Sequence, residues 1–260
     1  MATTIAAIYR YPVKGLSPER LDRVSLCRGE CLPEDRRFAL ALATTRFDPA
    51  QPQWLPKTAF AMLMRDESLA RLQTQFDPAT GELTIARAGS VVLRAALTDP
   101  AGRRAVGDFI GEFLGDTIPR PLRVVAAPGH AFADARRKPN ATTDQYVSLI
   151  NRNSVTALAD AVGAPVDELR FRANVYCGGD LPAWHELDWI GRDIALGGAR
   201  LRGVAAITRC AATQVNPLTA ARDLDIPAGL QRHFGHNLMG VYAEVAGGGA
   251  IALGDRLTTR

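Results

Sequence analysis

A single cysteine stands at the end of an alternating strand pattern late in the chain. Cys210 lies in the segment Ile207-Thr208-Arg209-Cys210-Ala211-Ala212-Thr213-Gln214-Val215-Asn216-Pro217. A thiol at a strand end can face a pocket, where it can bind a soft metal or carry a transferable sulfur atom. The preceding guanidinium of Arg209 favours the reactive thiolate. A lone cysteine is more often a small buried hydrophobe, so this segment alone leaves both interpretations open.

Six short motifs extend the argument along nearly the whole chain. They are Tyr11-Pro12-Val13-Lys14-Gly15, the segment Gly29–Phe38, Phe171-Arg172-Ala173-Asn174-Val175, Ala183-Trp184-His185-Glu186 followed by Ile190-Gly191, Thr208-Arg209-Cys210 with Thr213 and Pro217, and Leu238–Tyr242 followed by Ile251–Asp255. In this order they resemble the MOSC superfamily, and within it the two-part proteins related to the molybdenum-cofactor amidoxime-reducing component. Each motif is weak alone, and the order of all six carries the resemblance.

The resemblance implies a fold and a division of the chain. We expect a mainly β protein with α+β elements, built from two closely packed β-barrel-like parts with a cofactor cleft between them. The parts are a MOSC N-terminal domain over residues 1–125 and a MOSC domain over residues 140–260. Clefts between parts of a protein are a common place for ligand sites.

The resemblance also implies the site. Cys210 would ligate the metal of a molybdenum-molybdopterin cofactor, which suits a soft thiolate. The cofactor carries a phosphate, and arginine and lysine suit phosphate recognition. The implied cofactor contacts are Lys14, Gly15, Arg36, Thr143, Asp144, Arg172, Asn174, Thr208, Arg209 and Asn237. Any one of the cations, taken singly, is also typical of a solvated surface.

The chain departs from the family pattern at two positions. Gly15 stands where the amidoxime-reducing members carry serine, and Asn216 stands where they carry aspartate. We also expect no iron–sulfur domain after Gly254-Asp255, because no four-cysteine set is present to hold a cluster. The family has a further, general association with pyridoxal phosphate binding.

Bulk composition excludes several classes of protein. With 260 residues, 47% hydrophobic and 22% charged, the sequence is typical of an ordinary globular protein. A net charge of +4 is too small to indicate nucleic-acid binding. No run approaches the roughly 20 apolar residues of a membrane span, and the early strand leaves no room for a signal peptide. Four unevenly spaced cysteines indicate a reducing, cytoplasmic location.

Periodicity and turn residues predict the elements that would position these groups. Strands are expected at 5–10, 22–26, 37–42, 241–245 and 251–253, with a hairpin over 76–83. One helix is expected between Gly102 and Gly115, and another over Ser154–Val162 with Ser154 as its N-cap and Gly163 as its stop. Residues 119–140 carry few periodic signals and are interpreted as the link between the two parts.

Other chemistry-bearing residues give weaker signals. Cys27 and Cys31 have no second pair to complete a metal site and are interpreted as structural. Cys177 lies beside a family motif, which leaves a place next to the active site open. His236 lies near the C-terminal motif, but the pattern favours a surface histidine. Glu186 and Asp188 are candidate acids, and a structural hydrogen bond is an equal alternative for them. No histidine grouping, hydrolase elbow or phosphate loop is present.

The sequence therefore predicts a molybdenum-cofactor reductase of N-hydroxylated or related N- or S-oxidised small molecules. The alternatives are a sulfur carrier or transferase that uses a Cys210 persulfide, and a non-catalytic cofactor carrier. A separate ferredoxin- or flavoprotein-type electron donor is expected, because no GxGxxG fingerprint or cluster motif is present. We expect no nucleic-acid or membrane partner.

Overall fold

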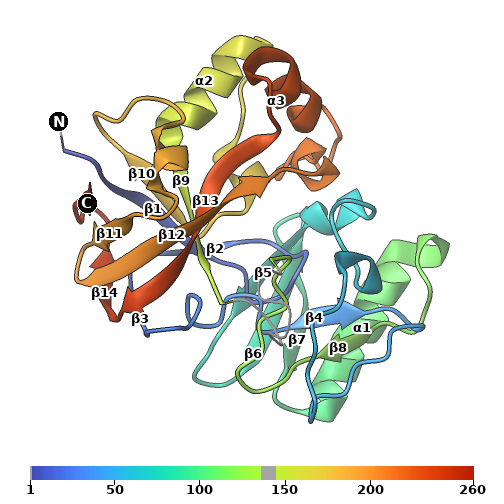
Figure 1. Cartoon of the computed structure of the whole chain (residues 1–260). Helices are drawn as coiled ribbons and strands as arrows, with labels where there is room; N and C mark the ends of the chain where they lie inside the picture. The colour runs from blue at the N-terminus through green and yellow to red at the C-terminus, as the bar shows by residue number, and fades with distance from the viewer. Residues whose placement is uncertain (1, 136–144) are drawn as a thin grey trace.

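A curled eight-stranded sheet dominates the fold and carries a second, smaller body at one side (Figure 1). The computed structural model describes residues 2–135 and 145–260. The strands of the large sheet follow the order β15-β11-β12-β13-β9-β10-β1-β2. In chain order they are β1 (Thr4–Arg10), β2 (Glu19–Leu21), β9 (Val147–Asn151), β10 (Val175–Gly178), β11 (Asp193–Leu196), β12 (Ala199–Thr208), β13 (Leu238–Gly247) and β15 (Leu257–Thr259). The predicted mainly β, barrel-like fold is confirmed.

The long strands β12 and β13 form the middle of the large sheet. Along β12, buried and more exposed residues alternate, as expected for a strand with one face on the core. Most neighbours pair antiparallel, but β9 and β10 are parallel because α2 (Arg152–Val162) crosses between them. Because β12 ends at Thr208, Arg209 and Cys210 lie at one end of the large sheet.

Three small sheets complete the strand set. The second body contains the meander β5-β6-β7 and the pair β4-β8, which pack with α1 (Pro100–Leu114), whereas β3 pairs with β14 beside the large sheet. Their bounds are β3 (Arg23–Leu26), β4 (Ala39–Ala41), β5 (Leu72–Phe76), β6 (Glu82–Arg87), β7 (Ser90–Ala96), β8 (Arg123–Val125) and β14 (Gly249–Ala252).

The first three strands of the chain join its second half. β1 pairs with β10, and β3 pairs with β14, so hydrogen bonds cross the predicted boundary between 1–125 and 140–260. The division itself remains a prediction. What the strand pairing establishes is that the second body is formed mainly by the middle of the first half.

Local sequence signals explain the helix ends. Asp99 caps α1 by accepting from the Gly102 amide at 3.2 Å, and Pro100 follows at the first helical position. Helix α2 ends at Gly163, as predicted, with a left-handed backbone. Its predicted N-cap was wrong. Asn151 caps the helix by accepting from the Asn153 amide, and Ser154 lies inside the first turn, where its hydroxyl donates to Glu186.

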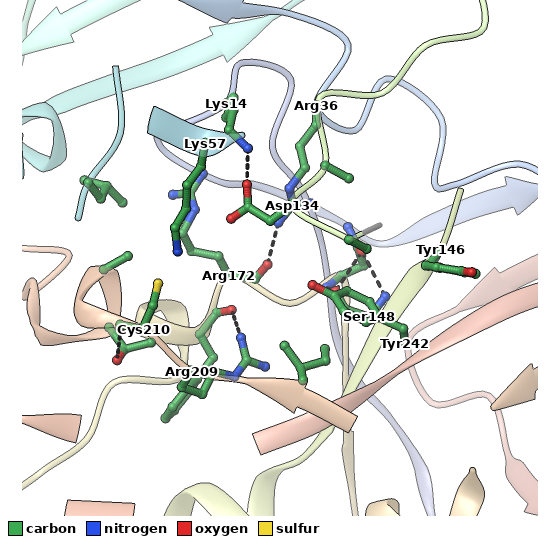
Figure 2. Close-up of a pocket in the computed structure, with 18 of the residues that line it drawn as sticks. Lys14, Arg36, Lys57, Asp134, Tyr146, Ser148, Arg172, Arg209, Cys210 and Tyr242 are labelled. Atoms are coloured by element: carbon green, nitrogen blue, oxygen red, sulfur yellow. Dashed lines mark hydrogen bonds and ion pairs between the residues drawn. The ribbon is translucent and has the colours of Figure 1, made fainter. Parts of the chain in front are cut away.

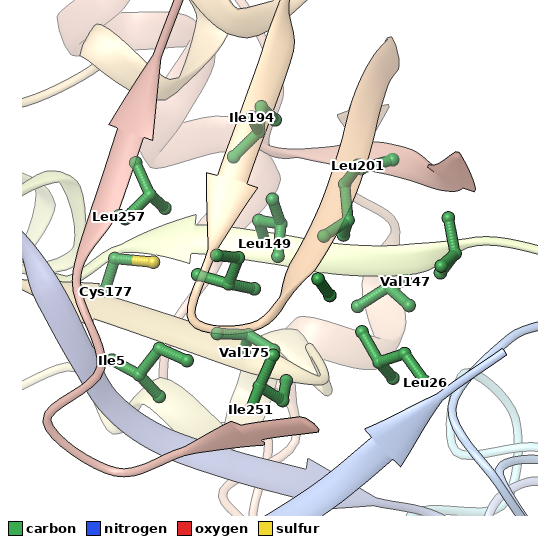
Figure 3. Packing of buried hydrophobic residues seen from close by; sticks show 14 of the residues in the cluster. Ile5, Leu26, Val147, Leu149, Val175, Cys177, Ile194, Leu201, Ile251 and Leu257 are labelled. Carbon is green, nitrogen blue, oxygen red and sulfur yellow. The ribbon is translucent and has the colours of Figure 1, made fainter. Parts of the chain in front are cut away.

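The apolar core is divided between the two bodies. Figure 3 shows the core of the large sheet, where Ile5 and Leu26 from the chain start pack with Leu149, Leu201 and Ile251. A second cluster joins α1 to the strands of the smaller body. Each fully buried aliphatic side chain contributes roughly 1.5–3 kcal/mol, so both bodies have substantial cores of their own. Cys177 lies in the first cluster and is therefore a core residue.

Several elements have no counterpart among the predicted ranges, and two of them lie near the site. β8 lies within residues 119–140, which were interpreted as a link, and α3 (Ile226–Phe234) follows the cysteine loop. Of the helices in the described part of the chain, none has the length and apolar character needed to cross a bilayer.

Candidate functional site

A cavity of about 380 Å³ lies where the end of the large sheet meets the smaller body (Figure 2). Its walls come from distant parts of the chain, including residues near 14, 36, 57, 134, 172 and 210. The volume falls within the usual range for small-molecule sites. The cavity therefore brings together most of the residues that the sequence motifs singled out.

Cys210 lies at the end of β12, at the start of the short 3-10 helix η6 (Ala211–Gln214). Its carbonyl accepts hydrogen bonds from the Thr213 amide at 3.0 Å and the Thr213 hydroxyl at 2.8 Å, which fix the turn. The half-buried side chain lines the cavity, and its sulfur points inward (Figure 2). Among the described residues the sulfur has no hydrogen-bond partner, so the thiol is open to a ligand.

Arg209 anchors this turn to the neighbouring backbone. Its guanidinium is buried and donates to the Met239 carbonyl at 2.9 Å and to the Phe171 carbonyl at 2.8 Å. Burial lowers the pKa of Arg209, although the carbonyl oxygens compensate part of the lost hydration. The donors of Arg209 are thus engaged by the backbone, and the side chain positions Cys210 against β13.

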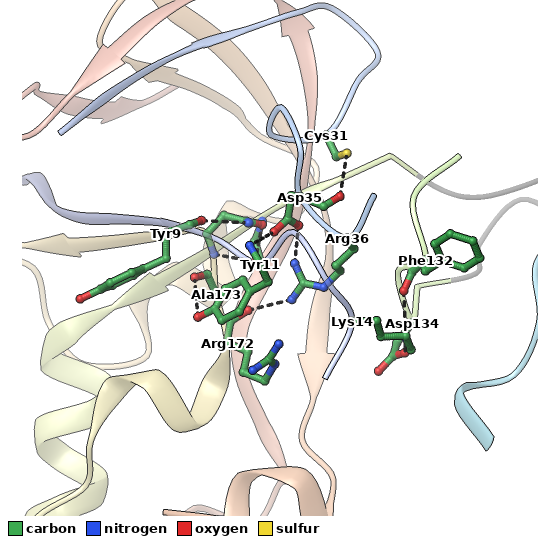
Figure 4. Close-up of polar contacts among 12 residues, drawn as sticks. Tyr9, Tyr11, Lys14, Cys31, Asp35, Arg36, Phe132, Asp134, Arg172 and Ala173 are labelled. Carbon is green, nitrogen blue, oxygen red and sulfur yellow. Dashed lines mark hydrogen bonds and ion pairs between the residues drawn. The ribbon is translucent and has the colours of Figure 1, made fainter. Parts of the chain in front are cut away.

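Two guanidinium groups flank the buried ring of Tyr11 (Figure 4). Arg36 lies 5.0 Å and Arg172 4.3 Å from the ring centroid, both within cation–π range. Arg36 is paired with Asp35, which also accepts from the Tyr11 amide at 2.8 Å. Burial acts to lower the pKa of Arg36, but Asp35 raises it above its ordinary value. Arg36 also donates to the Arg172 carbonyl at 2.9 Å, which joins the two bodies.

Arg172 differs from Arg36 because no carboxylate of the described residues forms an ion pair with it. Burial lowers the pKa of Arg172 to about 10. Within residues 2–135 and 145–260 its guanidinium has no hydrogen-bond acceptor or ion-pair partner. It lines the cavity, and a cation that is removed from water without a partner favours an anionic ligand.

Lys14 lies in the same cavity and is 8% exposed. Its ammonium group donates to the Phe132 carbonyl at 2.9 Å and forms an ion pair with Asp134. Burial lowers the pKa of Lys14, against the opposing effect of Asp134. Lys57, at the start of the 3-10 helix η1 (Lys57–Ala59), also lines the cavity, and its ammonium group has no acceptor in the part of the chain that the structure covers.

The remaining predicted contacts are placed differently. Asn174 lines the cavity, but its amide donates to the Tyr9 carbonyl and accepts from Ser148, so it fastens β1 to β9. Thr208 is an exposed cavity residue. Asn237 contributes its carbonyl to the Arg209 amide and is outside the cavity lining. Thr143 and Asp144 lie outside the described residues.

The two departures from the family pattern have local structural reasons. Gly15 has φ +87°, and a Cβ there would lie 3.2 Å from the Ala61 carbonyl, so serine would be strained. The Asn216 amide donates to the Asp223 carboxylate at 2.7 Å. An aspartate at position 216 would instead place two carboxylates together.

Several cavity residues were not predicted from the sequence. They are Lys57, Asp134, Tyr146, Ser148 and Tyr242. Tyr146 and Tyr242 form one wall, with ring centroids 5.8 Å apart. Burial raises the pKa of Tyr242, so its hydroxyl keeps its proton at neutral pH. Alternation along β13 predicts a strand over 241–245, but no local signal shows that Tyr242 faces a cavity.

A comparison with protein-family profiles shows the family of this chain. The MOSC domain profile matches residues 129–258, which is half of the chain. The crystal structure of the YuaD protein from Bacillus subtilis is 14% identical with a TM-score of 0.46, over 100% of this chain and 96% of that chain. YiiM from Geobacillus stearothermophilus is 17% identical with a TM-score of 0.35, over 44% of this chain and 53% of that chain. No curated protein sequence matches significantly. The chain belongs to the MOSC domain family, which is associated with molybdenum-cofactor binding.

Proposed function

We propose that the cavity holds a molybdenum-molybdopterin cofactor and that the protein is a reductase of N-hydroxylated or related N- or S-oxidised small molecules. One observation carries the proposal: an open thiol, Cys210, shares a cavity with two cations, Arg172 and Lys57, that have no acceptor among the described residues. The first group suits a soft metal, and the other two suit an oxyanion.

The donor set fits such a cofactor in charge as well as in chemistry. Arg36 is balanced by Asp35 and Lys14 by Asp134, whereas Arg209 is held by carbonyl oxygens. Of the cavity cations in the described part of the chain, Arg172 and Lys57 then remain without an acceptor. A phosphate monoester carries close to two negative charges at neutral pH. A bound phosphate would therefore neutralise the charge that burial leaves uncompensated in the cavity.

The roles of the side chains follow from their contacts. Cys210 would ligate molybdenum as a thiolate, and Arg172 and Lys57 would bind the phosphate. When bound, the cofactor supplies the two-electron chemistry that reduces the substrate. Arg209 fixes the cysteine turn through Met239 and Phe171. Tyr242, which keeps its proton on Oη, offers a neutral hydrogen-bond donor within the same cavity.

We further propose that electrons come from a separate protein of the ferredoxin or flavoprotein type. No group of three or more histidine, cysteine or acidic residues in the described chain is arranged to hold a metal ion. Redox partners of this kind usually dock through small, transient interfaces.

Metal analysis with activity assays tests the proposal. Protein made in a cofactor-competent host should contain about one molybdenum per chain, the stoichiometry of a single Cys210 ligand. It should reduce an amidoxime or N-hydroxylated probe with reduced viologen. Cys210→Ser should lose this activity, whereas Cys27→Ser, at an exposed cysteine outside the cavity, should keep it.

Other results would replace the reductase with one of its alternatives. Cyanide-releasable sulfur without metal, lost in Cys210→Ser, would indicate a sulfur carrier. Molybdenum without turnover of any N- or S-oxidised probe would indicate a cofactor carrier. A serine variant that remains loaded and active would remove Cys210 from the site.

A further inference from the structure

One carboxylate in the cavity lies among cations that the proposed ligand would also need. Asp134 is paired with Lys14, and Figure 2 shows it between Lys14, Lys57 and Arg172. Burial alone would raise the pKa of Asp134, but Lys14, Arg36 and Lys57 hold it below its ordinary value. The carboxylate is therefore charged and stabilised by the cationic cluster.

The Asp134 side chain is accessible from the cavity. It lines the cavity and is 52% exposed, so a ligand there can reach the carboxylate. In contrast, the Lys14 side chain is 10% exposed. Asp134 thus covers the ammonium group of Lys14 with an acceptor that a ligand can reach and replace.

The described residues around Asp134 belong to no helix or strand, unlike much of the chain around the cations. The backbone amide of each of three cavity cations donates a hydrogen bond to another part of the backbone. Lys14 donates to the Phe38 carbonyl at 2.8 Å, Arg36 to the Tyr11 carbonyl at 2.7 Å, and Arg172 to the Leu169 carbonyl at 3.2 Å. Residues 133–135 have no regular secondary structure, and the backbone anchor that precedes them is the Phe132 amide on the Arg36 carbonyl at 2.8 Å. The Asp134 carboxylate can move away from Lys14 without breaking a strand or a helix.

We infer that Asp134 is an internal competitor for the anionic group of the ligand and sets the charge that the cavity accepts. The inference rests on the proposed anion-binding role of this cavity. With Asp134 in place, Arg172 and Lys57 are the two cavity cations without a hydrogen-bonded or ion-paired partner among the described residues, and together they match a divalent oxyanion. Removal of the Asp134 charge would add Lys14 as a third cation, strengthen binding of oxyanions and shift the preference towards more highly charged ones.

Anion titrations of the full-length protein test this inference without molybdenum. The probe is sulfate, which stays divalent at neutral pH, with pyrophosphate as a more highly charged comparison and nitrate as a monovalent one. The titrations are made by calorimetry at fixed ionic strength on protein from a host that lacks the pterin cofactor. Asp134→Asn is compared with wild type and with Asp188→Asn, a control at an exposed carboxylate outside the cavity.

Asp134→Asn should bind sulfate about tenfold more tightly or better, the size expected for one additional charge-assisted contact. The increase in affinity of Asp134→Asn over wild type should be larger for pyrophosphate than for sulfate, and smaller for nitrate. Asp188→Asn should match wild type. In a Lys14→Met background, Asp134→Asn should give a much smaller gain, because the contact that it frees is absent. Circular dichroism and thermal unfolding establish that each variant is folded.

Equal or weaker sulfate binding by folded Asp134→Asn would overturn the inference, because Asp134 would then be neutral or a contributor to the ligand site. An undiminished gain in the Lys14→Met background would overturn it as well. Molybdenum content is measured separately. Normal molybdenum loading, without a higher sulfate affinity in Asp134→Asn, overturns only the competitor role of Asp134. A higher sulfate affinity in Asp134→Asn, without molybdenum loading, overturns only the proposed reductase function.

Discussion

The proposed anion-binding role of Arg172 would come at the expense of stability. Its guanidinium stacks on Tyr11 but lacks an acceptor among the described residues, and burial lowers its pKa to about 10. A base with a depressed pKa in the folded state weakens the fold while it is charged, and this penalty is relieved only as the pH rises through the folded pKa near 10. At neutral pH the ligand-free protein therefore carries the penalty in full.

We predict that Arg172→Met leaves the stability of the ligand-free protein unchanged or raises it by up to about 1 kcal/mol, after allowance for partial exposure and the lost cation–π contact. The same variant should lose sulfate affinity by about tenfold or more. Chemical denaturation and calorimetry at pH 7 measure the two effects. A variant that is clearly less stable, with unchanged affinity, would assign Arg172 to the architecture rather than to the ligand.

At the residue scale, the sequence motifs singled out residues that the structure brings together in one cavity. Lys14, Arg36, Arg172 and Cys210 share a cavity, as the motifs suggested, although their ligand contacts remain predictions. Lys57 and Asp134 were missed for a physical reason. Each lies beside an irregular loop, and its direction depends on contacts with a distant part of the chain.

At the scale of elements, the close approach of β13 to β9 supports the cysteine turn. Gly240 has φ +77°, and a Cβ there would lie 2.5 Å from the Leu149 carbonyl. Its neighbour Met239 provides the carbonyl that holds Arg209. The close pairing of β13 with β9 at this point thus requires glycine at position 240.

We predict that Gly240→Ala destabilises the protein by about 1–3 kcal/mol more than Gly235→Ala, because overpacking is added to the backbone strain. Gly235 is a matched control, since its φ is +74° and no heavy atom lies within 4 Å of the place that an alanine methyl group would take. Urea denaturation of both variants isolates the packing contribution. Equal losses would mean that β9 can shift to accommodate the methyl group.

A buried acid joins α2 to the 3-10 helix η5 (His185–Trp189). Glu186 is 0% exposed and accepts from the Ser154 hydroxyl at 2.7 Å, while Ser154 accepts from the Trp184 amide at 2.8 Å. Burial raises the pKa of Glu186. An acid with a raised folded pKa gives stability that is present below its unfolded pKa and is lost as the pH rises through the folded pKa.

We predict that Glu186→Gln is increasingly favoured over wild type as the pH rises from about 4.5, the ordinary pKa region of glutamate, towards neutrality. The melting temperatures of the two proteins should converge below about pH 4.5 and separate as the pH rises above it. Glu30→Gln, at an exposed position, should show no such trend relative to wild type. A constant difference across the range would show that burial does not shift the pKa of Glu186 in the folded state.

Helix ends show the limit of local signals. Glycine after an apolar face correctly predicted where α1 and α2 end, because the positive φ at a helix stop favours glycine. Ser154 was misassigned because serine suits both a cap and a buried hydrogen bond, and the choice depends on Glu186, 32 residues away. Three-residue strands such as β8 leave too little periodicity to detect.

At the scale of the whole molecule, the site depends on contacts between segments far apart in the sequence. The strand pairs β1–β10 and β3–β14 could not be inferred from periodicity, since alternation predicts a strand but not its partner. Arg222 makes such contacts beside the cavity. Arg222 donates to the Met64 carbonyl at 2.9 Å and to the Ala211 carbonyl at 3.2 Å, and also pairs with Glu67.

These contacts tie the smaller body to the turn that carries Cys210, because Met64 lines the cavity and Ala211 follows the cysteine. We predict that Arg222→Ala changes global stability by no more than about 1 kcal/mol, as exposed ion pairs contribute little. Amide hydrogen exchange should nevertheless become faster in residues 62–67 and 211–214, because opening of one segment no longer costs the contacts to the other. Arg104→Ala, at an exposed position on α1, should leave both segments unchanged. Unchanged exchange in Arg222→Ala would show that core packing alone holds this wall of the cavity.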